Sequence, residues 1–200
     1  MRRVLVWATI GLAVLAVLGV GAWVFAARTV ETPAFEVAAA DGRFELRDYP
    51  AMIVAEAAVD GPRRAALGDG FRPLARYIFA REREGERIAM TAPVTQRGDG
   101  DGWIVGFVMP SRYTLDDLPP PGPTPVALRE TPPARMAAVR FSGRADDAML
   151  AEREAALRDW MATRGLEPAG PVTHAYYDDP FTPGFLRRNE ILIPVDRPAG

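Results

Sequence analysis

The sequence contains no cysteine and no lysine, and His174 is its single histidine. The lack of cysteine excludes a disulfide framework, a thiolate nucleophile and any Cys-based zinc or iron–sulfur site. The lack of lysine excludes Schiff-base chemistry and a lysine general base. Because cysteine usage says nothing about the redox compartment, the location of the protein has to be inferred from its N-terminal segment.

Patterns for catalysis are also scarce. The two serines, Ser111 and Ser142, lie outside any Gly-x-Ser-x-Gly elbow. Residues 98–102, Gly-Asp-Gly-Asp-Gly, lack the lysine of a phosphate-binding loop and the glutamate of an EF-hand, so a hairpin turn is the better interpretation. Asp178 and Asp179 could take part in carboxylate chemistry, although Asp-Asp-Pro is ordinary turn chemistry. We therefore expect a protein that is not an enzyme.

The charge of the chain argues against nucleic acid as a partner. All 24 basic residues are arginine, 26 residues are acidic, and the net charge is -2. The broad positive field that drives binding to a phosphate backbone is therefore missing. A composition of 48% hydrophobic and 25% charged residues is that of an ordinary globular protein, and the length suits one domain plus an appendage.

That appendage is an apolar run at residues 4–27, which Thr9 and three glycines interrupt. About two dozen residues at roughly 1.5 Å each span a hydrocarbon core. Trp7 and Trp23 lie near its two ends, where aromatic rings favour the lipid boundary. We expect residues 1–28 to form a transmembrane anchor that places the body outside the cytoplasm, on the periplasmic side. The alternative is a signal peptide that is cleaved near Ala26, which would release a secreted protein.

An internal repeat follows a short polar tether at residues 29–41. The string Leu46-Arg47-Asp48-Tyr49-Pro50 recurs as Leu128-Arg129-Glu130-Thr131-Pro132, and at the same offset Gly61 matches Gly143. Each half also ends in an apolar run that a proline stops. We infer a β-α-β-β unit that occurs twice, at about residues 42–117 and 126–196, within one domain at residues 42–196.

Periodicity predicts one helix in each half. In the first half, Leu67, Phe71 and Leu74 share a helical face within residues 62–79, although Pro73 and the glycines before it predict a kink or a restart. In the second half, Asp146 or Asp147 caps a helix that stops at Gly165. Strands are expected at residues 51–59, 88–94, 103–109 and 190–195. This pattern predicts an α+β fold, a mostly antiparallel sheet with two helices packed against it and a cleft between the halves.

Several strings together resemble the SOUL heme-binding protein family, over about residues 35–196. The most specific are Met90-Thr91-Ala92-Pro93-Val94 and Arg187-Arg188-Asn189-Glu190. The remaining strings are Phe44-Glu45-Leu46-Arg47-Asp48-Tyr49-Pro50, Phe71-Arg72-Pro73-Leu74-Ala75-Arg76-Tyr77-Ile78, Phe107-Val108-Met109-Pro110 with Tyr113 and Leu115, and Pro180-Phe181-Thr182-Pro183. The resemblance implies a distorted eight-stranded antiparallel barrel or sheet with two helices, which agrees with the repeat.

The resemblance also implies that heme or a related tetrapyrrole binds in an apolar pocket beside the first helix. Such a ligand is a broad apolar plate with two carboxylates, so it needs apolar walls and a cation at the rim. Arg76 matches a basic position of the family, whereas two further basic contacts fall near Gly68 and Thr182 and are lost. The family shares no axial iron ligand, and His174 is a candidate only because imidazole is the commonest protein ligand of heme iron, the alternative being an ordinary strand histidine. The residues assigned to the pocket are Leu67, Phe71, Leu74, Arg76, His174 and Phe181.

Two other functions remain open at this point. The duplicated fold also resembles bacterial effector-binding domains, which take drug-like cations and other small molecules and act as sensors. An enzyme that acts on a small substrate through carboxylates has little support from the sequence. Capture, buffering or transfer of a tetrapyrrole is the function that the residues and the resemblance together favour.

Overall fold

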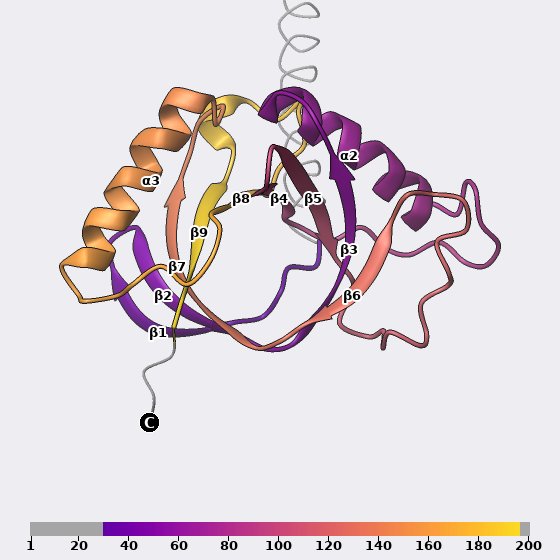
Figure 1. The fold of residues 1–200 in the computed structure, drawn as a ribbon, viewed down its shortest axis with the longest axis horizontal. Coiled ribbons are helices and arrows are strands. Elements are labelled where there is room, and N and C mark those ends of the chain that lie inside the picture. Colours follow the sequence, from indigo (N-terminus) through magenta and orange to yellow (C-terminus); the bar gives the residue numbers. More distant parts are fainter. Residues whose placement is uncertain (1–29, 197–200) are drawn as a thin grey trace, which may run out of the picture. The chain divides into compact units, whose positions relative to one another are not determined.

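The computed structural model describes residues 30–196, which form one antiparallel sheet with two α-helices on the same face (Figure 1). The elements in chain order are β1 (Glu36–Asp41), β2 (Phe44–Tyr49), β3 (Met52–Val59), α2 (Arg63–Ile78), β4 (Val94–Asp99), β5 (Gly102–Val108), β6 (Ala127–Thr131), β7 (Ala134–Phe141), α3 (Asp147–Ala162), β8 (Thr173–Tyr176), the short 3-10 helix η1 (Gly184–Leu186) and β9 (Asn189–Val195). No helix within this range is long and apolar enough to cross a membrane. The anchor expected at residues 1–28 lies outside the described residues.

The strand order displays the duplication directly. It runs β1-β2-β7-β9-β8-β4-β5-β3-β6, and each neighbouring pair is antiparallel. Apart from β1, the order β2-β7-β9-β8 from one end matches β6-β3-β5-β4 from the other. The repeated unit is therefore β-β-α-β-β, not the β-α-β-β unit that we predicted, because the repeated Leu-Arg string forms a strand of its own in each half.

The sheet has nine strands, not eight, and it is not closed into a barrel, since β1 and β6 form its two edges. The additional strand is β1, which occupies residues that we expected to belong to the tether. Its pairing with β2 is closed by a turn at Gly42, whose φ of +60° is a conformation that glycine adopts without strain. Asp41-Gly42 is a common hairpin dipeptide, so the turn could have been predicted.

Helix α2 runs without interruption from Arg63 to Ile78, so the predicted restart near Asp69 does not occur. It packs against β3 and β5, with Leu74 and Tyr77 fully buried. A Cβ atom at Gly70 would lie 2.6 Å from the side chain of Val105 on β5. The glycine is therefore what allows the helix to approach the sheet so closely.

Helix α3 agrees with its prediction. The Asp146 carboxylate accepts a hydrogen bond from the Met149 N–H at 2.9 Å, which caps the first turn. Gly165 follows the helix with a φ of +63°. Leu157 and Met161 are buried against β7 and β9. In each half, one helix thus covers one hydrophobic core on the same face of the sheet.

The hairpin predicted across residues 98–102 forms, but its first strand was misplaced, because only Val94 of the expected residues 88–94 belongs to β4. The strand β4 begins at Val94, and residues 88–92 run ahead of it outside the ladder. Ile88 is buried in the core beneath α2, whereas Thr91 forms an isolated bridge with Glu31. Ile88, Ala92 and Pro93 are therefore apolar because they are buried, whereas Ala89 and Met90 of the same run are exposed.

Two glycines of α2 make a matched test of this packing. We expect Gly70→Ala to lower the free energy of unfolding by roughly 1–3 kcal/mol, because the new methyl group would overlap Val105. Gly68 is exposed, with no atom within 4 Å of an added Cβ, so Gly68→Ala should raise that free energy by roughly 0.5–1 kcal/mol through helix propensity. Urea denaturation of both variants measures the two effects. Equal stability of the two variants would contradict the close helix–sheet contact.

Candidate binding groove

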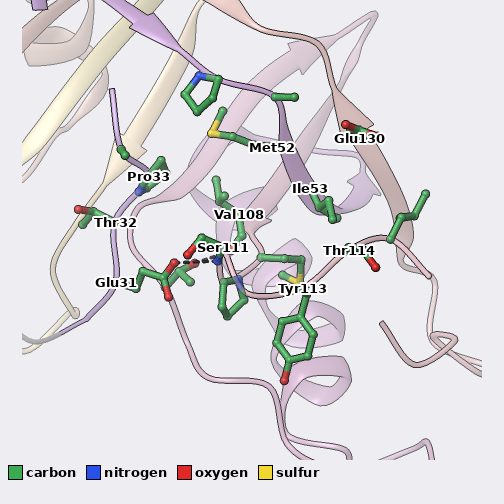
Figure 2. Close-up of a pocket in the computed structure, with 17 residues that line it drawn as sticks. Glu31, Thr32, Pro33, Met52, Ile53, Val108, Ser111, Tyr113, Thr114 and Glu130 are labelled. Atoms are coloured by element: carbon green, nitrogen blue, oxygen red, sulfur yellow. Dashed lines mark hydrogen bonds between the residues drawn. The ribbon is translucent and has the colours of Figure 1, made fainter. Parts of the chain in front are cut away.

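A groove of about 630 Å³ lies at the end of the sheet where β3 begins and β5 ends (Figure 2). Three segments that are distant in sequence form its walls. They are residues 31–34, the turn after β2 with the start of β3 at residues 50–53, and the end of β5 with the loop that follows it at residues 108–111 and 113–115, together with Thr91 and Glu130. The volume is in the range of small-molecule sites, roughly 300–1,000 Å³.

The walls of the groove are mainly apolar, and the charged side chains that line it are acidic. Met52 and Val108 contribute apolar surface from β3 and β5. The Glu31 carboxylate accepts a hydrogen bond from the Ser111 N–H at 2.8 Å. Glu130 is exposed on β6 and has no ion pair with any described residue. The nearest cation in sequence is Arg112, between two lining residues, whose guanidinium donates to the Tyr113 hydroxyl at 2.9 Å.

Residues 31–35 form a strap that separates this groove from a smaller cavity of about 70 Å³. Thr32 and Pro33 line both spaces. The Ala92 N–H donates to the Glu31 carbonyl at 2.9 Å, which holds one end of the strap. At the other end, the Phe35 ring packs on the Tyr49 ring at 5.2 Å. The segment that we predicted as part of a tether is thus a structural wall of the groove.

Most arginines on the sheet face opposite the helices are already paired. Arg47 and Arg188 both donate to the buried Glu190 carboxylate, at 2.6 and 2.8 Å. Burial alone would raise the pKa of Glu190, but the two guanidinium groups outweigh it and hold that pKa below its usual range. In the other half, Arg129 pairs with Glu56 in the same way, at 2.7 Å. These cations are therefore not free to meet the carboxylates of a ligand.

The structure brings together only some of the residues that we assigned to a pocket. Leu67, Phe71 and Leu74 lie side by side on α2, but they face the sheet and pack in its core. Leu74 is fully buried. Arg76 is exposed, and it pairs with Glu82 at 3.3 Å. None of these four residues lines the groove.

The other two predicted residues lie elsewhere. His174 is buried on β8, and its Nδ1 has no hydrogen-bond partner. Burial and the nearby Arg63 guanidinium lower the pKa of His174 to about 4. Phe181 is 92% exposed in the loop between β8 and β9. Among the residues that the structure describes, no group of three or more His, Cys, Asp or Glu side chains could hold a metal ion.

Sequence reasoning missed the groove, although a signal for it was present. Thr91 belongs to the Met-Thr-Ala-Pro-Val string, and Val108, Met109 and Pro110 belong to the Phe-Val-Met-Pro string. These strings carried the family resemblance, yet none of their residues that line the groove was assigned to the pocket. Because they come from separate parts of the chain, their convergence becomes visible only in the fold.

Known structures share this fold at low sequence identity. The C-terminal domain of EcmrR superposes with a TM-score of 0.58 and 15% identity, over 77% of this chain and 97% of that domain. A protein described as a hydrolase from Listeria innocua gives a TM-score of 0.55 and 15% identity, over 80% of this chain and 94% of its own. Likenesses at this level of identity concern the fold alone.

Comparison by sequence is more specific. No curated protein sequence matches the chain. The family model of the SOUL heme-binding protein matches residues 30–194, which include every strand and helix described above except the last residue of β9. The matched range contains the strings that border the groove and both copies of the repeated Leu-Arg string. The chain belongs to the SOUL heme-binding protein family.

Proposed function

We propose that this protein binds heme or a related tetrapyrrole in the groove, for capture, buffering or transfer. The observation that carries the proposal is the groove itself, about 630 Å³ with mainly apolar walls, in a chain of a heme-binding family. A flat apolar ligand gains most of its affinity from such walls, because they remove its faces from water.

The charges of the groove fix how an acidic tetrapyrrole would lie. Its two propionates would be repelled by the Glu31 and Glu130 carboxylates, which line the groove, and they would be attracted by Arg112, which does not line it but donates to the lining residue Tyr113. The plate would therefore lie against Met52 and Val108 with its propionates toward Arg112. Iron, when present in the ligand, supplies redox and ligand-binding chemistry, and the groove supplies the apolar surroundings.

The site beside α2 that the family resemblance implies stays a second location for the same ligand. Its proposed apolar wall is largely occupied by core packing, because Leu67, Phe71 and Leu74 face the sheet. Arg76 and Phe181 are its exposed members, and Leu67 and Phe71 are half-buried. The two locations share no residue, so they can be tested separately.

Binding without catalysis fits the arrangement of the two acids that we considered for carboxylate chemistry. The Asp179 carboxylate accepts hydrogen bonds from the Phe181 and Thr182 N–H groups, at 2.7 and 3.1 Å. The Asp178 carboxylate accepts one from the Arg188 N–H at 2.6 Å. Both acids therefore shape the loop between β8 and β9.

We further propose that the body works outside the cytoplasm, tethered by the apolar run at residues 4–27.

A second candidate function follows from the same charges. The side chains that line the groove include two carboxylates and no cation, and this suits an apolar cation at least as well as an acid. A sensor module that takes a lipophilic cation, the effector-binding alternative raised by the sequence, would use Glu130 as the counter-charge. One variant can separate the two ligand classes.

We expect hemin, titrated into the full chain in detergent, to give a saturable shift of the Soret band. Glu130→Gln should tighten this binding roughly two- to tenfold, because it removes a carboxylate that repels the propionates. Arg76→Glu, on the exposed side of α2, should leave the affinity unchanged. If Arg76→Glu lowers the affinity for hemin and Glu130→Gln leaves it unchanged, the ligand binds beside α2 and not in the groove. A Soret band that shows no saturable shift would refute tetrapyrrole binding.

The sensor alternative predicts the opposite effect of the same substitution. Tetraphenylphosphonium, followed by calorimetry, should bind the unchanged protein and should bind Glu130→Gln roughly two- to tenfold more weakly. Leu115, which is exposed at the groove, offers a matched control, since Leu115→Glu adds a carboxylate and should strengthen cation binding. If the protein binds hemin but does not bind tetraphenylphosphonium, this alternative is excluded.

His174 stays a proposed iron ligand, since its Nδ1 is unpaired and its low pKa keeps the imidazole in the neutral form that binds metals. It does not line the groove, and the charged groups near it are Arg63 at the start of α2 and Asp147 and Glu154 on α3. Its pKa also has a consequence that is independent of any ligand. The unfolded chain takes up a proton on this histidine near pH 6.5, whereas the folded chain does so only near pH 4.

We therefore expect the contribution of His174 to stability to be complete above about pH 6.5 and to be lost as the pH falls toward 4. The whole loss amounts to roughly 3 kcal/mol. Urea denaturation at pH 7 and at pH 5, compared between the unchanged protein and His174→Gln, measures it. The variant should lose less stability between these two pH values. If both proteins lose the same amount, His174 titrates normally in the folded state.

A further inference from the structure

The loop between β8 and β9 presents the three most exposed large apolar side chains of the described residues. Phe181 is 92% exposed, Phe185 is 77% exposed and Leu186 is 54% exposed. They lie within six residues of one another in the sequence Phe-Thr-Pro-Gly-Phe-Leu. Single exposed apolar residues are common, but a group of large ones marks an interaction surface.

The backbone of this loop is held firmly while its apolar side chains point away from the core. The Thr182 hydroxyl donates to the Asp179 carboxylate at 3.1 Å, and the Arg187 guanidinium donates to the Thr182 carbonyl at 2.8 Å. The Gly143 N–H donates to the Gly184 carbonyl at 3.0 Å, which fixes the loop to the segment between β7 and α3. The exposure is therefore a property of the folded loop and not of a loose segment.

This loop lies at the same end of the sheet as Glu31, and from Glu31 the chain leads back to the apolar run at residues 4–27. Val94, the first residue of β4, pairs with Tyr176, the last residue of β8, and Tyr176 pairs with Asn189, the first residue of β9. The loop therefore leaves the sheet at the start of β4. Glu31 is bridged to Thr91, just ahead of that start.

The sequence leaves little chain between the body and the apolar run. The run ends at Ala27, four residues before Glu31, and four residues reach at most about 14 Å. A bilayer that takes up the run would therefore lie close to this end of the sheet. Arg144, exposed beside Gly184, adds a cation that suits anionic headgroups.

We propose that the loop between β8 and β9 docks Phe181, Phe185 and Leu186 into the surface of the bilayer that holds the N-terminal run. Phe and Leu are the side chains that amphipathic elements place at the boundary between headgroups and acyl chains, about 5–10 Å deep. The loop is thus a second membrane contact, which fixes the orientation of the body on the lipid surface.

The absence of cysteine makes a direct test possible. Phe185→Cys in the full chain creates a single labelling site for an environment-sensitive fluorophore. The labelled protein is reconstituted in vesicles of phosphatidylcholine and phosphatidylglycerol, with acyl chains that are brominated or not. We expect blue-shifted emission and about twofold quenching by the brominated lipid, because the label would lie at the depth of the acyl-chain boundary.

Asp101→Cys is the matched control. Asp101 is exposed in the turn after β4, at the opposite end of that strand, and the strand separates the two ends by roughly 17 Å. Its label should keep the emission that it has in water and should not be quenched. Equal quenching at both positions, or none at Phe185→Cys, would overturn the proposal. A blue shift at Phe185→Cys that hemin causes without vesicles would also overturn it, because the loop would then serve the tetrapyrrole.

Discussion

The structure depends on an exchange of outer strands between the two halves of the repeat. Strand β2 of the first half pairs with β7 of the second, and β6 of the second half pairs with β3 of the first. Neither half can complete its own sheet, and the central contact between β8 and β4 also joins one half to the other. Each helix covers a core on strands of its own half, but those strands keep their register only through partners from the other half. The two cores are therefore expected to form together, as one cooperative unit.

The repeated Leu-Arg string has a physical explanation in this exchange. Leu46 and Leu128 face the cores beneath the helices, whereas Arg47 and Arg129, the next residues, face the opposite side of the sheet. Arg47 then pairs with Glu190 on β9, and Arg129 pairs with Glu56 on β3, so each arginine binds a glutamate of the other half. The net stability of a buried ion pair is small, but the loss of one partner is costly, which makes such pairs effective in fixing register. The two connections differ in detail, because the buried Arg47 reaches past β7 to β9, whereas the partly exposed Arg129 pairs with the neighbouring strand β3.

Local signals in the sequence predicted the helices and the cap at Asp146, because these depend on residues that are close along the chain, and the recurrence of the Leu-Arg string predicted the duplication. They failed for β1, whose six residues are all exposed and whose strand structure comes only from pairing with β2. Helical periodicity placed Leu74 on an apolar face correctly, but it could not distinguish a face that meets a ligand from one that meets the sheet. The candidate groove was out of reach for a related reason. Its walls come mainly from residues 31–34, 50–53, 108–111 and 113–115, and only the folded sheet brings them together.

The groove, the strap and the exposed loop all belong to one end of the sheet. Val94 begins β4 there, it pairs with Phe107 beside the groove residue Val108, and its other neighbour Tyr176 leads into the loop. The strap joins these features, because Thr32 and Pro33 line the groove and also share the small cavity with Tyr177 and Arg188. A tetrapyrrole is a broad apolar plate with acidic edges, so it concentrates at the surface of a membrane rather than in water. A body docked by its loop would hold the groove at the depth where such a ligand gathers, and the ligand could then be captured or released with little exposure to solvent. The proposed ligand and the proposed docking are thus consistent with each other, because both depend on the low solubility of a tetrapyrrole in water.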